Sequence, residues 1–273
     1  MTFEKNIIHL DDVSSRVKNP RSRLYESNIG FIEVYEPNEI EKSLELIQRR
    51  LENGIHAVCC FSYNLGLAFQ GLPPKASLLN SPLIRAWFFK KYRKLSATEV
   101  DEWIESQLDL ERSQQMESDG GIVDVNFEID EQTFCENIDN IHGEIRKGET
   151  YQVNYTFNIT GKTYGSTMGL YKRLRQRQRC RYGALICCEG NRILSFSPEL
   201  FLSKTGTNIL TKPMKGTLSS REHSAQDLKN DKKNRAENVM IVDLLRNDLS
   251  QISKVGSVKT PMLFEVENVG DIL

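Results

Sequence analysis

The sequence predicts an α+β fold built from antiparallel strands and separate helices. In the second half, the strand-like segments "GALICC", "RILSFSPELFLSK" and "NILTKPMKGT" follow one another through short turns at residues 189–191 and 205–207. Short turns of this kind join antiparallel neighbours. Runs of strands with helices set apart from them favour α+β over a doubly wound parallel sheet.

Helices and strands in the first 165 residues follow from the spacing of apolar side chains. Apolar residues at helical spacing predict a helix from about Glu39 to Leu51, which ends near Asn53-Gly54. A second helix carries Phe134, Ile138, Ile141 and Ile145 on one face and is closed by Lys147-Gly148. Residues 56–63 are a candidate for a buried strand, and "TYQVNYTFNITG", residues 150–161, predicts another.

A polar stretch, "LERSQQMESDGGIVD" at residues 110–124, has the composition of a linker. It predicts two regions. Residues 1–120 would form an N-terminal strand and helix region, and residues 121–273 would form part of a second domain. Near the end, Ser224 to Asp227 has the form of a capping box that opens a long helix. The centre of this helix, "VMIVDLL", is apolar almost all round and predicts a buried helix.

Composition excludes several classes of function. The 273 residues include 36 Lys plus Arg and 37 Asp plus Glu, so no overall charge favours nucleic acid or an anionic membrane surface. No apolar run approaches the ~20 residues of a membrane-spanning helix. The N-terminal segment lacks the apolar core of a signal peptide, so we expect a cytoplasmic protein. The adjacent pairs Cys59-Cys60 and Cys187-Cys188 lie in apolar runs, which predicts buried free thiols rather than bridges or ligands.

Three polar residues lie in apolar surroundings and could carry chemistry. Glu199 stands between two apolar strands, where a carboxylate either faces solvent or is held in a site that suits a general acid. Glu237 shares a helical face with Met240 and Ile241, so it needs either a divalent metal or an ion pair, for instance with Lys233. Lys215 either reaches into water or acts as an amine nucleophile.

These residues belong to motifs that resemble the chorismate-utilising enzymes. The motifs occur in order as "GETYQVNYT", "ILSFSPELFLS", "TKPMKGT" and "DKKNRAENVMIVDLLRNDLSQISKVGSVKTPMLFEVE". The resemblance implies an anthranilate-synthase-component-I-like sandwich of antiparallel sheets with flanking helices. Residues 121–273 would be the N-terminal part of the chorismate-binding catalytic domain. The family's domain continues through further segments after these motifs, so we expect a catalytic domain that is incomplete at its C-terminus.

Two positions sort the activities within this family. Water-adding members carry a lysine that activates water where this sequence has Gln152, so addition of ammonia fits better here. Lys215 stands in Pro213-Met214-Lys215-Gly216-Thr217, where anthranilate synthases have an alanine and aminodeoxychorismate synthases have a lysine. The resemblance therefore points to the aminodeoxychorismate synthase component I branch, which serves p-aminobenzoate and folate synthesis. The alternatives are an anthranilate synthase component I-like enzyme and a non-catalytic fragment of the family.

The resemblance also implies a mechanism and a set of partners. Lys215 would attack chorismate to form a covalent adduct, and Glu199 would protonate the departing C4 oxygen. Mg²⁺ would be held partly by Glu237, and the substrate would contact Gln152, Gly216 and Thr217. A glutamine amidotransferase subunit would supply the ammonia. With one of two metal carboxylates, the chain is expected to bind Mg²⁺ and chorismate poorly.

Overall fold

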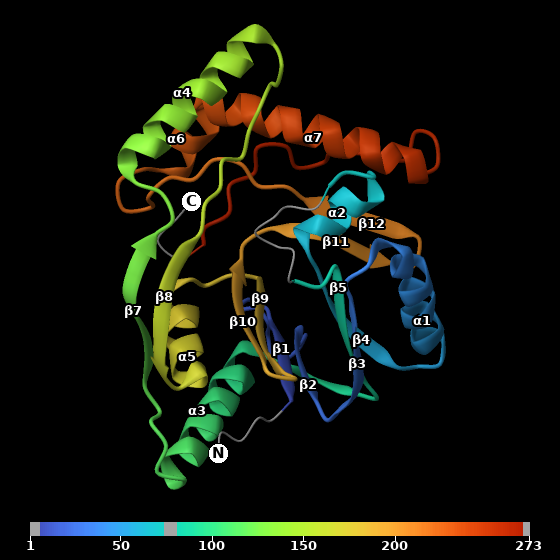
Figure 1. The fold of residues 1–273 in the computed structure, drawn as a ribbon, viewed down its shortest axis with the longest axis vertical. Helices are drawn as coiled ribbons and strands as arrows, with labels where there is room; N and C mark the ends of the chain where they lie inside the picture. Colours follow the sequence, from blue (N-terminus) through green and yellow to red (C-terminus); the bar gives the residue numbers. More distant parts are fainter. Residues whose placement is uncertain (1–5, 74–80, 270–273) are drawn as a thin grey trace. The chain divides into compact units, whose positions relative to one another are not determined.

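The computed structural model describes residues 6–73 and 81–269. Contacts divide the chain into two compact units that interleave along the sequence. Unit 1 comprises Met1–Glu102 and Cys180–Ser197, and unit 2 comprises Trp103–Arg179 and Pro198–Leu273. Figure 1 shows the course of the chain through both units. The sequence predicted two regions, residues 1–120 and 121–273. This division stays a prediction, because the units defined by contacts follow the fold and not one cut in the sequence.

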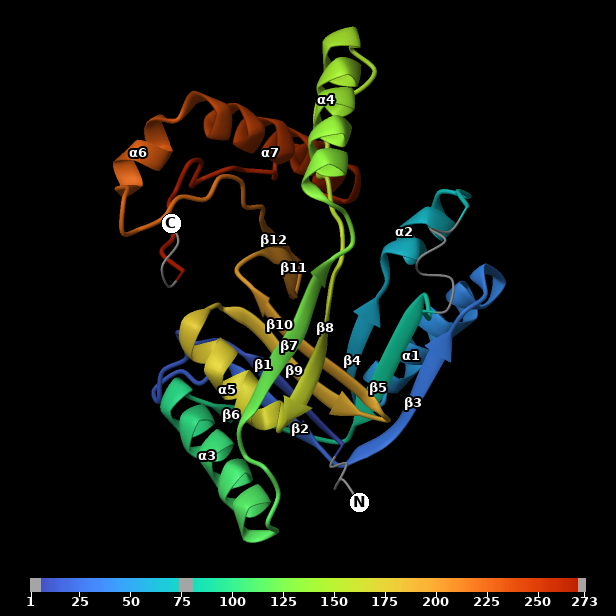
Figure 2. The same cartoon turned by 60° about the vertical axis from the view of Figure 1, so that its left-hand side comes forward.

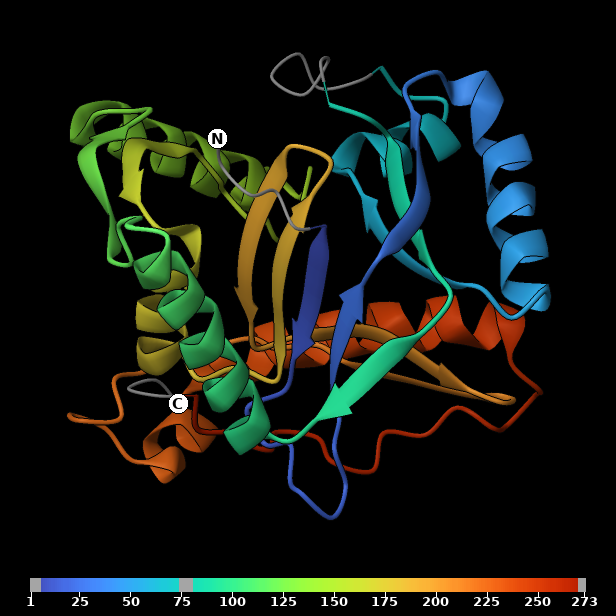
Figure 3. The same cartoon turned by 90° about the horizontal axis from the view of Figure 1, so that it is seen from below.

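Unit 1 contains a five-stranded antiparallel sheet. Its strands are β1 (Ile7–Asp11), β2 (Ser22–Glu26), β6 (Tyr92–Leu95), β9 (Tyr182–Cys188) and β10 (Asn191–Ser197). They lie in the order β10-β9-β1-β2-β6 and can be followed in Figure 3. In the central strand, Ile8 lies opposite Tyr25 on one side and Ile186 on the other. The N-terminal strand is thereby paired with a segment about 180 residues away in the sequence.

A second antiparallel sheet packs against the first. It is formed by β3 (Asn28–Val34), β4 (His56–Phe61) and β5 (Ile84–Phe89), in the order β3-β5-β4. Alternate residues of β5 serve two cores because successive side chains of a strand point to opposite faces. Trp87 and Phe89 pack with Ile8 and Ile186 between the sheets, whereas Phe88 belongs to a separate cluster on the other face.

Helix α1 (Ile40–Glu52) covers that other face of β5. Ile40 and Ile47 are buried there, which confirms the apolar spacing predicted from the sequence. The helix ends at Asn53, and Gly54 follows with a φ of 76°. Unit 1 also contains η1 (Pro37–Glu39) and α2 (Tyr63–Phe69). The α+β prediction, with sheets packed as a sandwich beside helices, is confirmed.

Unit 2 begins inside α3 and contains a two-stranded ribbon. The elements are α3 (Ala97–Ser113), β7 (Gly120–Phe127), α4 (Glu131–Lys147), β8 (Ile159–Gly165) and α5 (Thr167–Arg177). Figure 2 shows α5 lying along the β7–β8 ribbon. Asp130 caps the start of α4 by accepting from the Thr133 N–H, and Gly148 ends it with a φ of 81°. The predicted helix with its Lys147-Gly148 stop is confirmed.

The predicted linker at residues 110–124 is wrong. This stretch contains the last turn of α3 and the first half of β7. Its glycines serve close packing instead of flexibility. A Cβ on Gly120 would collide with the Ser166 carbonyl oxygen, and one on Gly121 would lie 2.5 Å from the Tyr164 hydroxyl oxygen.

The strand predicted at residues 150–161 is only partly correct, because β8 begins at Ile159. Residues 152–158 run outside any ladder. Their apolar side chains pack against α4. The ring of Phe134 lies 5.7 Å from that of Tyr155 and 6.0 Å from that of Phe157, measured between centroids.

The C-terminal part of unit 2 contains β11 (Leu200–Thr205), β12 (Asn208–Lys212), α6 (Ala225–Asn230) and α7 (Lys232–Ile252). The capping box of Ser224 and Asp227 is present, but it opens the six-residue α6. The long helix α7 has its own N-cap, Asp231. The prediction of a buried α7 is wrong: no residue of α7 is buried, and Val239 and Leu244 are each 40% exposed. An apolar helix is buried only as far as neighbours surround it, and the described elements leave every residue of α7 at least partly exposed.

The six cysteines are all free, which confirms the prediction that the two adjacent pairs form no bridges. The predicted burial of these pairs holds only for Cys188, because Cys59, Cys60 and Cys187 are half-buried. Burial raises the pKa of the Cys188 thiol to about 12 and that of the Cys59 thiol to about 11. Both thiols therefore stay protonated near neutral pH and are poor nucleophiles. None of the helices in the described part of the chain is long and apolar enough to cross a bilayer.

The core between the two sheets of unit 1 predicts a large effect for Ile8→Ala. Ile8 is fully buried, so its truncation should lower the free energy of unfolding by about 2–5 kcal/mol. Val17→Ala is the control, because Val17 is 73% exposed and its loss should change the free energy by less than about 0.5 kcal/mol. Urea unfolding followed by tryptophan fluorescence measures both. Equal midpoints for the two variants would contradict the assignment of Ile8 to the core.

Candidate functional site

Lys215 lies three residues beyond the end of β12, as the hairpin pattern predicted. Its side chain is half-buried, and its Nζ donates a hydrogen bond to Oδ1 of Asn154 at 2.8 Å. Asn154 belongs to the irregular segment before β8. Lys215 is thus held by a residue from the other stretch of unit 2 and does not simply extend into water.

Gly216 fixes the path of the chain next to Lys215. Its φ is 82°, a left-handed conformation that favours glycine. A Cβ built on Gly216 would lie 2.8 Å from Cγ of Asn234, in the first turn of α7. The backbone N–H of Asn234 in turn donates to the N-cap, Asp231, at 2.7 Å. The segment after β12 therefore rests directly on the capped start of α7.

Glu199 is brought to the same segment. It lies between β10 and β11, and its Oε1 accepts a hydrogen bond from the backbone N–H of Met214 at 3.2 Å. The carboxylate is thus tied to the residue that precedes Lys215. Its side chain is exposed, so it faces solvent, which was one of the two alternatives for this position.

Glu237 lies one turn after Asn234 on α7, and residues three apart share a helix face. Its side chain is 30% exposed, and Lys233 Nζ lies 3.9 Å from its Oε1. The ion-pair alternative is therefore present, with Lys233 itself 83% exposed and the pair correspondingly weak. Among residues 6–73 and 81–269, no group of three His, Cys, Asp or Glu side chains could hold a metal ion. Glu237 thus offers a single carboxylate, which suits one position around Mg²⁺.

The other two predicted substrate residues have no described contact with Lys215. Gln152 is half-buried, and its carbonyl oxygen accepts from the Thr150 hydroxyl at 3.2 Å. Thr217 is exposed and follows Gly216 directly. The structure therefore joins Glu199, Lys215 and Gly216 through the segment after β12. Glu237 lies three residues after Asn234 on α7, and Gln152 lies two residues before Asn154, without a described contact to Lys215.

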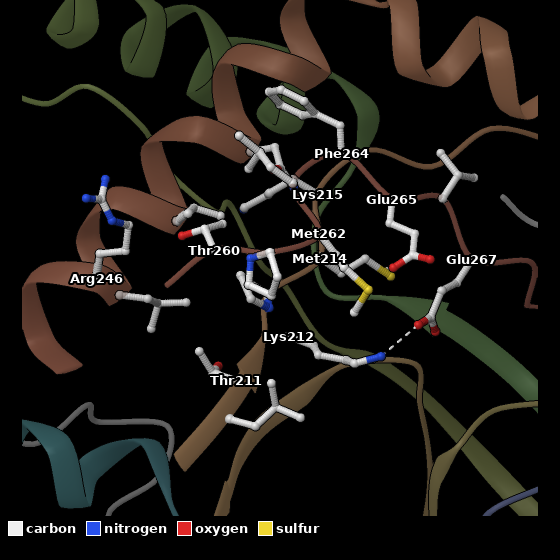
Figure 4. Close-up of a pocket in the computed structure, with 18 of the residues that line it drawn as sticks. Thr211, Lys212, Met214, Lys215, Arg246, Thr260, Met262, Phe264, Glu265 and Glu267 are labelled. Carbon is white, nitrogen blue, oxygen red and sulfur yellow. Dashed lines mark hydrogen bonds and ion pairs between the residues drawn. The ribbon is translucent and has the colours of Figure 1, made fainter. Parts of the chain in front are cut away.

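A cavity of about 250 Å³ opens beside this segment. Its walls come from β12, residues 213–216, α7 and the C-terminal stretch 258–269. That last stretch is attached at two points: Lys212 Nζ lies 3.0 Å from Oε1 of Glu267, and the Arg235 guanidinium lies 4.1 Å from the ring centroid of Phe264. Figure 4 shows the first contact among the lining residues. Four cationic side chains line the cavity, Lys212, Lys215, Arg246 and Lys259, together with the carboxylates of Glu265 and Glu267.

The excess of cationic over anionic groups in this lining suits a ligand with carboxylate groups, since ammonium and guanidinium groups pair with carboxylates. Reasoning from the sequence missed Asn154 and the contribution of residues 258–269. The alternation of polar and apolar residues from Tyr151 to Phe157 was a signal for Asn154, because it places Gln152 and Asn154 on one side of an extended segment.

Comparisons with known proteins agree on one family. A family model described as chorismate binding enzyme matches residues 15–273. Aminodeoxychorismate synthase component 1 of Salmonella typhimurium is 39% identical over 129 residues, covering 45% of this chain and 28% of that protein. The Escherichia coli protein of that name is 40% identical over the same length, with the same shares. An anthranilate synthase component 1 of Haloarcula marismortui is 32% identical over 152 residues, covering 54% of this chain and 30% of that protein.

A solved structure shows the same fold. The chain matches the crystal structure of anthranilate synthase component I from Streptococcus pneumoniae with a TM-score of 0.67 at 17% identity. The match covers 96% of this chain and 70% of that one. The predicted anthranilate-synthase-component-I-like fold is confirmed. The sequence alignments span less than a third of the length of these curated relatives.

The close approach at Gly216 predicts a specific cost for Gly216→Ala. The variant must adopt a left-handed backbone conformation and also displace Asn234, so it should lose about 2–4 kcal/mol of unfolding free energy. Gly206→Ala is the matched control. Gly206 has a φ of 59° with nothing within 4 Å, so its variant should lose only about 1 kcal/mol. Urea unfolding of the two variants separates the collision from the backbone strain. Equal losses would show that Asn234 does not constrain the segment.

Proposed function

The chain belongs to the chorismate binding enzyme family, and from that premise we propose that it is the chorismate-binding component of an aminodeoxychorismate synthase. The observation that carries the proposal is Lys215 on the segment after β12, with the Glu199 carboxylate bound to the backbone of the preceding residue. The Glu199 carboxylate comes from the connection between β10 and β11, and its hydrogen bond holds it at the residue next to Lys215. This arrangement supports nucleophilic attack paired with proton donation to a leaving group.

Each residue has a role in the proposed reaction. The neutral Lys215 amine attacks C2 of chorismate, both ring double bonds shift, and the C4 hydroxyl leaves as water with a proton from Glu199. The Glu199 carboxylate then takes the surplus proton of the new ammonium at C2. Ammonia then attacks C4, both double bonds shift back, and the lysine amine leaves C2 with a proton from Glu199. Loss of a proton from the new ammonium at C4 to the Glu199 carboxylate yields 4-amino-4-deoxychorismate. Two displacements through a covalent adduct replace one difficult substitution.

The substrate's two carboxylates fit the cationic lining of the cavity. Lys212, Arg246 and Lys259 line the cavity and would hold them, the first two by exchanging their ion pairs with Glu267 and Asp243 for the substrate. Gly216 also lines the cavity, whereas Gln152 and Thr217, which lie outside its lining, would contact the ring and its substituents from the neighbouring segments. Gln152 has no basic group to activate water, which supports ammonia as the incoming nucleophile. A glutamine amidotransferase subunit would supply that ammonia, in keeping with the "component 1" in the relatives' names.

Mg²⁺ is the proposed metal, with Glu237 as one of its ligands. When bound, the ion would neutralise a substrate carboxylate and draw electron density from the ring. Glu237 supplies one carboxylate from the first half of α7. It lies one turn beyond Asn234, the residue that contacts Gly216.

Lys215→Ala tests the covalent step. In the complete polypeptide that carries residues 1–273, this variant should lose aminodeoxychorismate formation by at least about a hundredfold, the lower end of what a positioned reacting group contributes. The assay supplies chorismate, Mg²⁺ and ammonium salt and measures the product by mass spectrometry. The same instrument should detect an adduct on the Lys215 peptide of the unaltered protein alone. Unchanged turnover in the variant would exclude the covalent mechanism.

The product assay also separates the alternatives. Formation of anthranilate and pyruvate would identify an anthranilate synthase, which 32% identity to such proteins keeps as the second candidate. No product from the complete polypeptide in the presence of ammonium would identify a non-catalytic member of the family.

Glu237→Gln tests the metal ligand without relying on turnover. Loss of one carboxylate should weaken Mg²⁺ binding, measured by calorimetry with chorismate present, by about tenfold or more, equivalent to about 1.4 kcal/mol. Asp248→Asn is the control, because it removes the same charge from an exposed position of the same helix. Equal affinities for Glu237→Gln and the unaltered protein would exclude Glu237 as a ligand.

A further inference from the structure

The hydrogen bond between Asn154 and Lys215 joins two segments that lie 61 residues apart in the sequence. The amide Oδ1 accepts from the amine at 2.8 Å. Within the described residues, no carboxylate forms an ion pair with Lys215. The acceptor that holds this amine is therefore an uncharged group.

The placement of Asn154 follows from its neighbours. Tyr155 faces α4, where its ring meets that of Phe134 and its hydroxyl accepts a hydrogen bond from Nδ2 of Asn137 at 2.7 Å. Phe157 faces the same helix. In an extended segment, successive side chains point to opposite sides. The packing of Tyr155 and Phe157 on α4 thus directs Asn154 the other way, toward the segment after β12.

The choice of an amide matters for an amine that must lose a proton. A carboxylate at this distance would stabilise the ammonium form of the lysine, whereas an amide oxygen accepts an N–H without adding negative charge. A neutral amine has two N–H groups and one lone pair. If one N–H is bound to Oδ1, the lone pair points away from Asn154 and stays available.

Two of the charged groups around this segment have partners of their own, while Glu265, Lys259 and Arg246 line the same cavity as Lys215. Lys212 pairs with Glu267, and the Glu199 carboxylate accepts from the backbone of Met214. Lys215 is half-buried, so a proton leaving its amine can pass to water.

We propose that Asn154 is a positioning residue, which orients the Lys215 amine through an uncharged acceptor and thereby permits its neutral, nucleophilic form. The proposal rests on the proposed function, in which Lys215 is the nucleophile. If it holds, two residues of the segment before β8, Gln152 and Asn154, take part in the reaction.

Asn154→Asp is the decisive variant, because it keeps the shape of the side chain and adds the charge. Purified 1–273 protein is labelled with acetic anhydride at mildly alkaline pH, and acetylation of each lysine is quantified by peptide mass spectrometry. Labelling of Lys215 relative to the exposed Lys254 should fall by about tenfold or more, since an opposite charge at contact distance shifts a protonation equilibrium by at least that factor. If Lys215 in this variant is acetylated as fast as in the unaltered protein, the proposal is overturned.

Two control variants distinguish an effect of the added charge from an effect of altered structure. Asn208→Asp adds the same charge at an exposed position of the β11–β12 hairpin and should leave Lys215 labelling unchanged. Asn154→Ala removes the acceptor without adding charge and should not slow the labelling. A fall in Asn154→Ala equal to that in Asn154→Asp would attribute the effect to altered structure and would also overturn the proposal.

The labelling experiment needs no turnover, so its failure differs from a failure of the proposed function. In the complete polypeptide, the turnover of Asn154→Asp should recover as pH rises, whereas that of Asn154→Ala should not. A Lys215→Ala variant with full activity would refute the proposed function even if the labelling contrast held. A normal labelling rate in Asn154→Asp, with an inactive Lys215→Ala, would refute only the role of Asn154.

Discussion

The pairing of β1 with both β2 and β9 is the contact on which the organisation of the chain depends. β1 is the central strand of its sheet, and its register places residues 7–11 against residues 183–187. Because of this pairing, the chain re-enters unit 1 after α5. Residues 103–179 are therefore a long insertion between the two stretches of unit 1. Closure of so long a loop costs little more than closure of a shorter one, because the entropy grows only with the logarithm of its length. The burial of Ile8 and Ile186 against Trp87 offsets that cost.

The same pairing explains why the candidate site draws on two separate stretches of sequence. After β10 the chain leaves unit 1 a second time at Pro198, and Glu199 is the next residue. Unit 2 is then completed by residues 198–273, which carry Lys215 and Glu237. Asn154 and Gln152 come from the earlier excursion. The hydrogen bond from Lys215 to Asn154 joins the two stretches, so the environment of the amine exists only in the folded unit.

Local signals in the sequence predicted many elements correctly. The apolar spacing of α1, the glycine stop of α4 and the capping box at Ser224 each depend on interactions within a few residues, so the sequence alone specifies them. Predictions failed where the outcome depends on distant partners. The glycines at residues 120 and 121 resembled those of a flexible linker, yet they permit close contact with residues 166 and 164, which lie more than 40 positions away. The apolar centre of α7 resembled a buried helix, but burial depends on which elements surround it.

The sequence by itself determined the family and the chemistry available to it. Motif order and the lysine at position 215 are properties of the chain that need no coordinates. The tertiary structure alone decided where that lysine lies and which atoms surround it. It placed Gly216 against Asn234, Glu199 on the backbone of Met214, and an amide instead of a carboxylate at the Lys215 amine. The physical reason is that a side chain's chemistry is local, whereas its neighbours are chosen by contacts between segments far apart in the sequence.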